Sequence, residues 1–201
     1  KETSFDMLTD PKIEGLPHHI SKDTPLPLLK QAAIYGANGA GKSNLIKAFV
    51  FLKNWGTNPK CLEEIEVCDY SFRMTDEDTK PPICLEVEFL SHQKAYLYKV
   101  AISEESIEES LYLSGLGKSA DTLIFERKDG KLLTHSLLNE SAINELLTAN
   151  KKASLLVLHQ GLGASYNPEL KAAYEWFDEQ LHIVKYPSDN LQLAKRLTSD
   201  E

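Results

Sequence analysis

A glycine-rich stretch, Gly36-Ala37-Asn38-Gly39-Ala40-Gly41-Lys42-Ser43, decides how the chain is interpreted. It matches the pattern Gly-x-x-x-x-Gly-Lys-Ser/Thr, in which a short loop connects a strand to a helix. Glycines keep side chains out of the loop and permit positive φ, so backbone N–H groups can converge on an anion. The helix that begins near Lys42 adds its own N-terminal N–H groups and its dipole. The stretch therefore predicts a phosphate-binding loop, or P-loop.

The loop residues have distinct predicted roles. We expect the Lys42 ammonium group to reach the β- and γ-phosphates of a nucleotide as a point charge. We expect the Ser43 hydroxyl to be a ligand of Mg²⁺. The other expected contacts come from the backbone around them, at Gly36, Ala37, Asn38, Gly39, Ala40, Gly41 and Asn44. The expected ligand is a nucleoside triphosphate with Mg²⁺, and the residues do not distinguish adenine from guanine.

The sequence on either side of the loop fits this prediction. Residues 28–35 predict a buried strand, with Ala32, Ala33 and Ile34 at its end. Residues 42–55 carry apolar side chains at helical spacing, and Gly56 is expected to end that helix. A strand before the loop and a helix after it are the context that a P-loop requires. Residues 1–60 are thus predicted to hold a lead-in segment, the strand, the P-loop and its helix.

Residues 61–138 show the period-two alternation of antiparallel strands. On one predicted strand Leu85, Val87 and Phe89 alternate with polar residues, which indicates one buried and one wet face. Short polar turns such as 129–130 separate the runs, so we expect an antiparallel meander. The predicted strands are 64–72, 83–90, 95–102, 107–113 and 122–127.

Residues 139–201 are predicted to form helices and a closing strand. Asn167-Pro168-Glu169 is a typical helix start, because Asn caps, Pro fits the first turn and Glu faces the positive end of the dipole. The apolar residues of this helix then recur on one face, at Leu170, Ala173, Tyr174, Phe177 and Leu181. Residues 141–148 predict a shorter helix, 155–158 an apolar run of undecided type, and 182–186 the strand.

Composition limits the function classes. The 201 residues carry a net charge of −8 and a pI of about 5.3, which argues against a chain that binds nucleic acid over its whole surface. No apolar run is long enough to span a membrane. The three cysteines form no metal-binding pair, so we expect reduced thiols and a cytoplasmic location. The chain opens on Lys1, and we expect both of its ends to be cuts in a longer protein.

The stretch from Ile34 to Leu45 resembles the loop of the SMC, RecF and OLD group of ABC-type ATPase heads. More narrowly, it is similar to the AAA-type, ABC-like ATPases of bacterial abortive-infection and antiphage systems. Residues 3–7, 82–89 and 174–177 agree with this resemblance. It implies an α/β P-loop NTPase fold, with an ABC-ATPase-like head that combines an antiparallel meander and a helical C-terminal part. The whole chain, 1–201, would then be one partial head domain that binds ATP and Mg²⁺.

ABC-type heads also need a signature motif and a Walker B strand ending in Asp-Glu, and this chain offers imitations of both. Leu113-Ser114-Gly115-Leu116-Gly117 is similar to a signature, but strand patterns flank it, which favours a hairpin turn. Asp178-Glu179 is similar to a Walker B end, but helical spacing explains the apolar residues before it, which favours a solvated helix face. We therefore predict no catalytic residue in this chain, and no hydrolysis by it alone.

Gln160 is a further candidate, because SMC-like heads place a Mg²⁺-sensing glutamine at a comparable distance after the P-loop. The alternative is an ordinary polar residue at the end of a helix or strand. The expected function is an ATP-dependent switch that forms a homodimer or higher oligomer through the nucleotide and controls a nuclease or toxin effector. Alternatives are a RecF- or SMC-type DNA-repair or chromosome-maintenance head, for which nucleic-acid binding is possible, and a regulatory module that never hydrolyses nucleotide.

Overall fold

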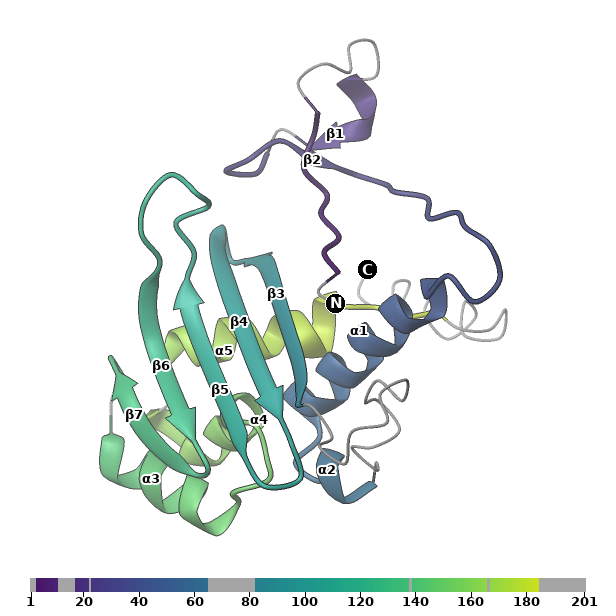
Figure 1. Cartoon of the computed structure of the whole chain (residues 1–201). Coiled ribbons are helices and arrows are strands. Elements are labelled where there is room, and N and C mark those ends of the chain that lie inside the picture. The colour runs from purple at the N-terminus through teal and green to yellow at the C-terminus, as the bar shows by residue number, and fades with distance from the viewer. Residues whose placement is uncertain are drawn as a thin grey trace, which may run out of the picture.

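The computed structural model of the chain describes residues 3–10, 17–21, 23–64, 82–137, 139–165 and 167–184. Strands and helices separate into a five-stranded sheet and a group of helices, with a small β1–β2 pair beside them (Figure 1). In chain order the elements are η1 (Pro17–His19), β1 (Ile20–Ser21), β2 (Leu28–Leu29), α1 (Lys42–Thr57), α2 (Cys61–Glu64), β3 (Ile83–Ser91), β4 (Lys94–Ile102), β5 (Ile107–Leu113), β6 (Thr122–Lys128), β7 (Lys131–His135), α3 (Glu140–Ala149), α4 (Leu155–Leu158), η3 (His159–Ser165), α5 (Pro168–Glu175) and the π-turn η4 (Trp176–Gln180).

The five-stranded sheet is a meander in which β3 to β7 lie in sequence order and every neighbouring pair is antiparallel. The two-residue turn between β3 and β4 has positive φ at both His92 (48°) and Gln93 (64°). Asp129 (48°) and Gly130 (80°) repeat this between β6 and β7. Positive φ at both central residues is the turn that matches the twist of a tight hairpin. The predicted meander is confirmed, and β7 is a strand that the prediction missed.

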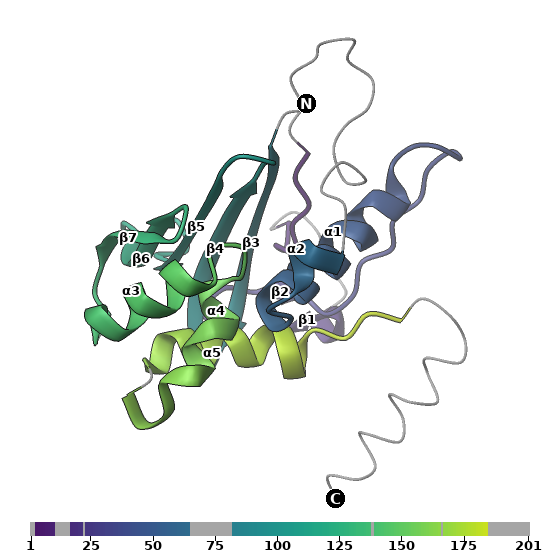
Figure 2. The same ribbon diagram turned by 90° about the horizontal axis from the view of Figure 1, so that it is seen from below.

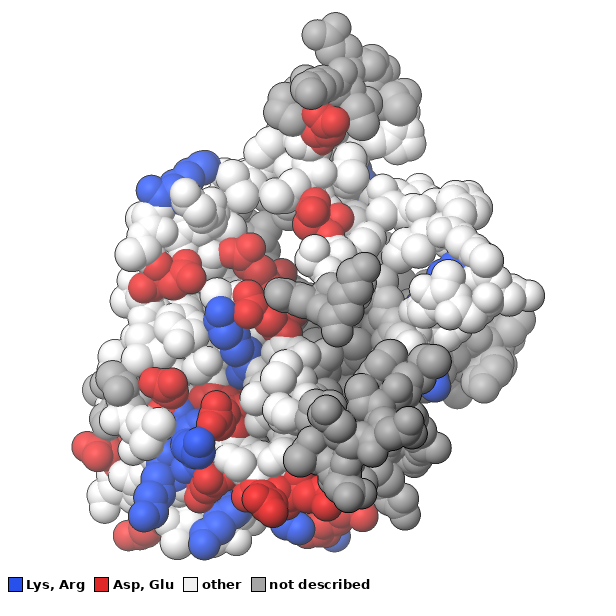
Figure 3. Space-filling view, viewed as in Figure 1, with Lys and Arg blue, Asp and Glu red and all other residues white. Residues whose placement is uncertain are grey.

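The sheet has one covered face and one open face. The four helices α1, α3, α4 and α5 lie on the same side of it (Figure 2). Phe89 of β3, Tyr98 of β4 and Leu111 of β5 point to that side and are buried in the core. The opposite face carries interspersed acidic and basic side chains (Figure 3), among them the ion pair Lys99–Glu86, with 2.9 Å between Nζ and Oε2. The predicted alternation of buried and wet residues is confirmed.

A buried polar cluster joins the sheet to the helices. The Glu109 carboxylate accepts hydrogen bonds from Arg127 Nε (2.5 Å), Tyr98 Oη (2.6 Å), Ser154 Oγ (2.6 Å) and the Leu155 amide (3.0 Å). Both Glu109 and Arg127 have side chains with no exposed surface. Desolvated charges are tolerated in a core only when their hydrogen-bonding capacity is filled, as it is here. The cluster therefore fixes α4 against β4, β5 and β6.

Helix α5 begins and is held as its sequence predicts. The Asn167 side chain caps it by accepting a hydrogen bond from the Glu169 amide (3.1 Å), and Pro168 lies in the first turn. Glu169 bonds Lys94 (2.7 Å) and Tyr96 (2.5 Å) of β4, and these bonds hold its pKa below the ordinary value although partial burial opposes the shift. The helix start was predicted correctly, and α5 is anchored to the sheet at its first turn.

The predicted strand at residues 28–35 is wrong in extent and burial. Only Leu28–Leu29 forms a strand, paired with β1, and residues 30–36 are exposed and have no regular structure. Ile34 is 48% exposed and Tyr35 90% exposed. A strand exists only where a neighbour supplies a hydrogen-bonding ladder. The Lys30 amide still donates to the His19 carbonyl oxygen (2.8 Å), but within the described residues no ladder continues along 31–35.

Three other predictions need correction or lie outside the described residues. Gly56 does not end α1, which continues to Thr57. Gly56 instead lies within the helix, where the lack of a side chain leaves room for the Phe177 ring. Residues 61–64 form the helix α2 rather than the start of the meander, and 65–72 lie outside the described residues. Residues 182–184 form no strand, and 185–186 also lie outside the described residues.

Candidate nucleotide-binding site

The P-loop has the backbone shape that its sequence predicts at two of its glycines. Gly39 has a φ of 84° and Gly41 a φ of 88°, in the left-handed region that disfavours side chains. Gly41 is also the residue that precedes the first turn of α1. These two residues turn the chain so that the loop runs directly into the helix, and a Cβ at either glycine would meet no other atom within 4 Å.

Lys42 lies across the loop that precedes it. Its ammonium Nζ donates hydrogen bonds to the carbonyl oxygens of Gly36 (2.6 Å) and Ala37 (2.7 Å). The side chain therefore bends back from the first residue of α1 over the start of the loop. Because Lys has three donors, it can hold the loop and still bind an anionic oxygen placed there. The predicted contact of Lys42 with the phosphates of a nucleotide stays a prediction.

The start of α1 offers the remaining donors. An α-helix leaves its first N–H groups without intrahelical partners, and here these include the amides of Lys42 and Ser43. The Asn44 amide is already used, since it donates to the Gly41 carbonyl oxygen (2.9 Å). The first turn of α1 contains no acidic residue, so no carboxylate of that turn competes for these donors. The donor set fits a phosphate group, and the exposed Ser43 hydroxyl is suited to a divalent cation beside it.

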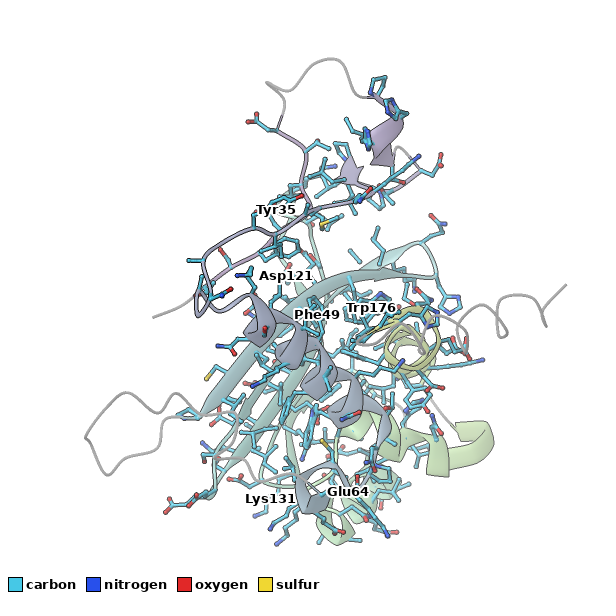
Figure 4. The ribbon with its side chains drawn as sticks, turned by 90° about the vertical axis from the view of Figure 1, so that its right-hand side faces the viewer. Tyr35, Phe49, Glu64, Asp121, Lys131 and Trp176 are labelled. Carbon is cyan, nitrogen blue, oxygen red and sulfur yellow. The ribbon has the colours of Figure 1, made fainter. Side chains whose placement is uncertain are left out.

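The helix that carries these donors is anchored far from the loop. Its buried residues, Phe51, Leu52, Trp55 and Gly56, all lie in the second half of α1. Trp55 Nε1 donates to Tyr98 Oη (2.7 Å), which links the helix to the Glu109 cluster. In Figure 4, Phe49 lies on the body of α1, whereas Tyr35 lies on the segment that leads into the loop. The phosphate-binding end of α1 thus projects from the packed part of the molecule.

Gln160 is not brought to the P-loop by any contact of the described residues. It is exposed and lies in η3, which directly follows α4. The first residue before α4, Ser154, lies 3.3 Å (Oγ to Oη) from the same Tyr98 hydroxyl that Trp55 binds. α4 therefore packs beside the end of α1 opposite to the loop, as Figures 1 and 2 also show. The role of Gln160 as a metal ligand stays a prediction.

The two imitation motifs have the structures that were favoured for them. Residues 114–121 form the turn between β5 and β6, where the Gly115 amide donates to Asp121 Oδ1 (2.8 Å). Asp178 and Glu179 are exposed residues of the π-turn η4, and no strand leads to them. Asp178 lies beside the second half of α1, where its carbonyl oxygen accepts a hydrogen bond from Lys53 Nζ (3.0 Å). Within the described ranges there is also no group of three or more His, Cys, Asp or Glu residues that could hold a metal ion.

The left-handed glycines, the Lys42 ammonium group and the free amides at the start of α1 form a loop with the donors that a phosphate group needs, although no strand leads into it among the described residues. Over residues 32–197 the chain matches the family model described as "AAA domain, putative AbiEii toxin, Type IV TA system". The chain belongs to this family, which confirms the predicted relation to AAA-family ATPases of abortive-infection systems and the P-loop NTPase fold class. No curated protein and no solved structure matches it. None of the helices in the described part of the chain is long and apolar enough to cross a bilayer.

Three residues that support the site were not found from the sequence. Lys53 and Gly56 hold the second half of α1 against η4. Glu109 organises the buried polar cluster that Trp55 of α1 contacts through Tyr98. Glu109 lies on a predicted strand between Glu108 and Ser110, where the alternation pattern does place it on the buried face. A carboxylate on a buried face was thus an available signal. Lys53 had no comparable signal, because a lysine within a helix is normally solvated.

Proposed function

We propose that this chain is the ATP-binding part of an ABC-type ATPase and that it binds ATP with Mg²⁺ at Gly36 to Ser43. The observation that carries the proposal is the joint placement of the Lys42 ammonium group over the loop and the left-handed glycines before α1. Membership of an AAA-domain family supports a nucleotide as the ligand. The choice of adenine rests on the resemblance to ATPases, since no described residue is placed to select a base.

The residues of the site would act by binding and orienting. Lys42 would keep its two carbonyl partners, donate its third hydrogen to a phosphate oxygen and offset the negative charge there. The amides at the start of α1 would donate to phosphate oxygens, with the helix dipole adding to the attraction. Ser43 and the predicted ligand Gln160 would hold Mg²⁺, which supplies charge neutralisation between the phosphates when it is bound.

Hydrolysis to ADP and phosphate would need residues from outside the described site. A general base must lie within hydrogen-bond reach of the attacking water. Among the described residues, Asp178 and Glu179 are the sequence candidates, and they lie on η4 beside the far half of α1. We therefore propose that the 201-residue chain binds nucleotide without turning it over, and that the complete protein is the ATPase.

The proposed biological role is a switch that dimerises, or forms a higher homo-oligomer, around the nucleotide and controls a nuclease or toxin effector in the cytoplasm. The family description names a putative toxin and a toxin–antitoxin system, which supports a defence role. A phosphate-binding end that projects from the packed core is compatible with a second subunit covering it. Analytical ultracentrifugation with a slowly hydrolysed ATP analogue tests this. A dimer with the analogue and a monomer with ADP are expected, and a monomer in both contradicts it.

Two other functions remain as alternatives. A RecF- or SMC-type head would need a basic surface for nucleic acid, and the face seen in Figure 3 instead mixes both signs of charge. A regulatory module that never hydrolyses is favoured by the lack of a base near the P-loop among the described residues. A phosphate-release assay on the complete protein separates these readings: turnover supports the ATPase, and its absence despite nucleotide binding supports the regulatory module.

A further inference from the structure

Helix α1 is supported very unevenly along its length. None of its residues from Lys42 to Val50 is buried, whereas Phe51, Leu52, Trp55 and Gly56 are. A helix is stiff over sixteen residues, so whatever holds its second half also sets the direction of its first half. The contacts made by that second half therefore determine where the phosphate-binding end lies.

Lys53 makes the charged contact of this second half. Its ammonium Nζ donates to the carbonyl oxygens of Asp178 (3.0 Å) and Leu181 (2.7 Å). These carbonyls lie in the π-turn η4 and just after it, where helical carbonyls lack partners and the helix dipole is negative. Lys53 thus caps the C-terminal end of η4 from the second half of α1.

A close backbone approach lies next to this cap. A Cβ built on Gly56 would come within 3.2 Å of Cγ and Cδ2 of Phe177, so the backbone of α1 packs directly against the Phe177 ring of η4. Phe177 is fully buried and packs edge-on to Tyr98, with 5.5 Å between ring centroids. In Figure 4 Trp176, the first residue of η4, lies beside α1 as well. A sliding movement of α1 along η4 is therefore opposed by tight packing as well as by hydrogen bonds.

We infer that Lys53 is a positioning residue for nucleotide binding and couples the P-loop to η4, the π-turn that follows α5. The inference rests on the proposed function, because it concerns the same phosphate site. Lys53 follows Lys42 by eleven positions, about 16 Å along the helix axis, so it does not touch the nucleotide. It sets the tilt of α1, and with it the placement of the loop donors. By reciprocity, nucleotide binding tightens the contact between Lys53 and η4.

The test compares two lysines of the same helix in the 201-residue chain. Lys53→Met keeps the aliphatic stem and removes the ammonium group, and Lys47→Met makes the same change at an exposed position of the first half. Binding of a fluorescent ATP analogue with Mg²⁺ gives the affinity. Hydrogen exchange of the Leu181 amide, which donates to the Trp176 carbonyl oxygen (2.8 Å), reports on η4 with and without ATP. Thermal unfolding without nucleotide serves as the control for folding.

Lys53→Met is expected to weaken nucleotide binding roughly 3- to 10-fold, which is the size of effect that a coupled position far from a ligand can have. It should also abolish the additional hydrogen-exchange protection that ATP gives to the Leu181 amide. Lys47→Met should do neither. If Lys53→Met does not fold, Lys53→Arg, which retains donors, serves instead and should keep affinity within about twofold. Unchanged affinity and protection in Lys53→Met overturn the inference, even if its unfolding temperature falls. No binding by the unaltered chain contradicts the proposed function, and the inference with it.

Discussion

Replacing Glu109 by Gln tests whether the buried cluster holds the fold together. The substitution keeps the shape of the side chain and removes its charge. The carboxylate accepts four hydrogen bonds, from Arg127, Tyr98, Ser154 and the Leu155 amide. A glutamine has one acceptor oxygen, so at least one donor loses its partner, and the guanidinium group remains buried without a counter-charge.

The expected loss of stability is large because neither charge of the Glu109–Arg127 pair is exposed. Removing one partner of a buried ion pair costs about 3–5 kcal/mol. In a chain of this size that corresponds to a fall in unfolding temperature of roughly 10 °C. Combining the change with Arg127→Met should add little, because the second substitution removes the cation that the first one left unpaired.

The neighbouring pair Glu108–Lys128 is a matched control on the same two strands. Its Oε1–Nζ distance is 2.6 Å, but its side chains are 54% and 49% exposed and lie on the open face of the sheet. Glu108→Gln should therefore cost about 0–1 kcal/mol. Urea unfolding followed by circular dichroism measures all three variants. Equal small losses for Glu109→Gln and Glu108→Gln would refute the account of the cluster.

Three further predictions concern titratable groups. The pKa of Glu169 is lowered, so the stability that its carboxylate contributes is present above pH 4.5 and is lost as the pH falls below that value. Glu169→Gln should therefore make the midpoint of urea unfolding depend less on acid pH. Burial lowers the pKa of His159 from 6.5, so the unfolded chain takes up a proton at a higher pH than the folded chain does. The free energy of unfolding should therefore decrease as the pH drops below 6.5, and His159→Gln should weaken this decrease. Burial raises the pKa of the Cys61 thiol to about 12, so iodoacetamide at pH 8 should label the exposed Cys84 before Cys61, as peptide mass spectrometry would show.

The sequence predicted those elements whose stability is mainly local. The strands 83–90, 95–102, 107–113 and 122–127 alternate clearly, and each lies within its observed strand. The capped start at Asn167 and the helix after Lys42 were likewise readable from a few neighbouring residues. β7 was missed because Lys131–His135 is a short edge strand with little apolar alternation, and it is formed by the tight turn at Asp129-Gly130.

The errors arose where distant parts of the chain decide the structure. Residues 28–35 have the composition of a buried strand, but burial depends on neighbours that local sequence does not specify. Gly56 has the usual meaning of a helix end, and only the ring of Phe177, far along the chain, shows why it lies within α1. For the candidate site, the loop geometry at Gly39, Gly41 and Lys42 followed from the motif, whereas the support by Lys53 did not.

The central claim is that Gly36 to Ser43 binds the phosphates of a nucleotide, and isothermal titration with ATP and Mg²⁺ tests it most directly. Lys42→Ala removes the ammonium group that now lies 2.6 Å (Nζ to O) from the Gly36 carbonyl oxygen, while Lys47→Ala removes an exposed lysine of the same helix. The account predicts saturable binding by the unaltered chain and by Lys47→Ala. It predicts that Lys42→Ala weakens binding at least about tenfold, the loss of one charge-assisted contact. Equal affinity in all three proteins, or no binding in any of them, would contradict it.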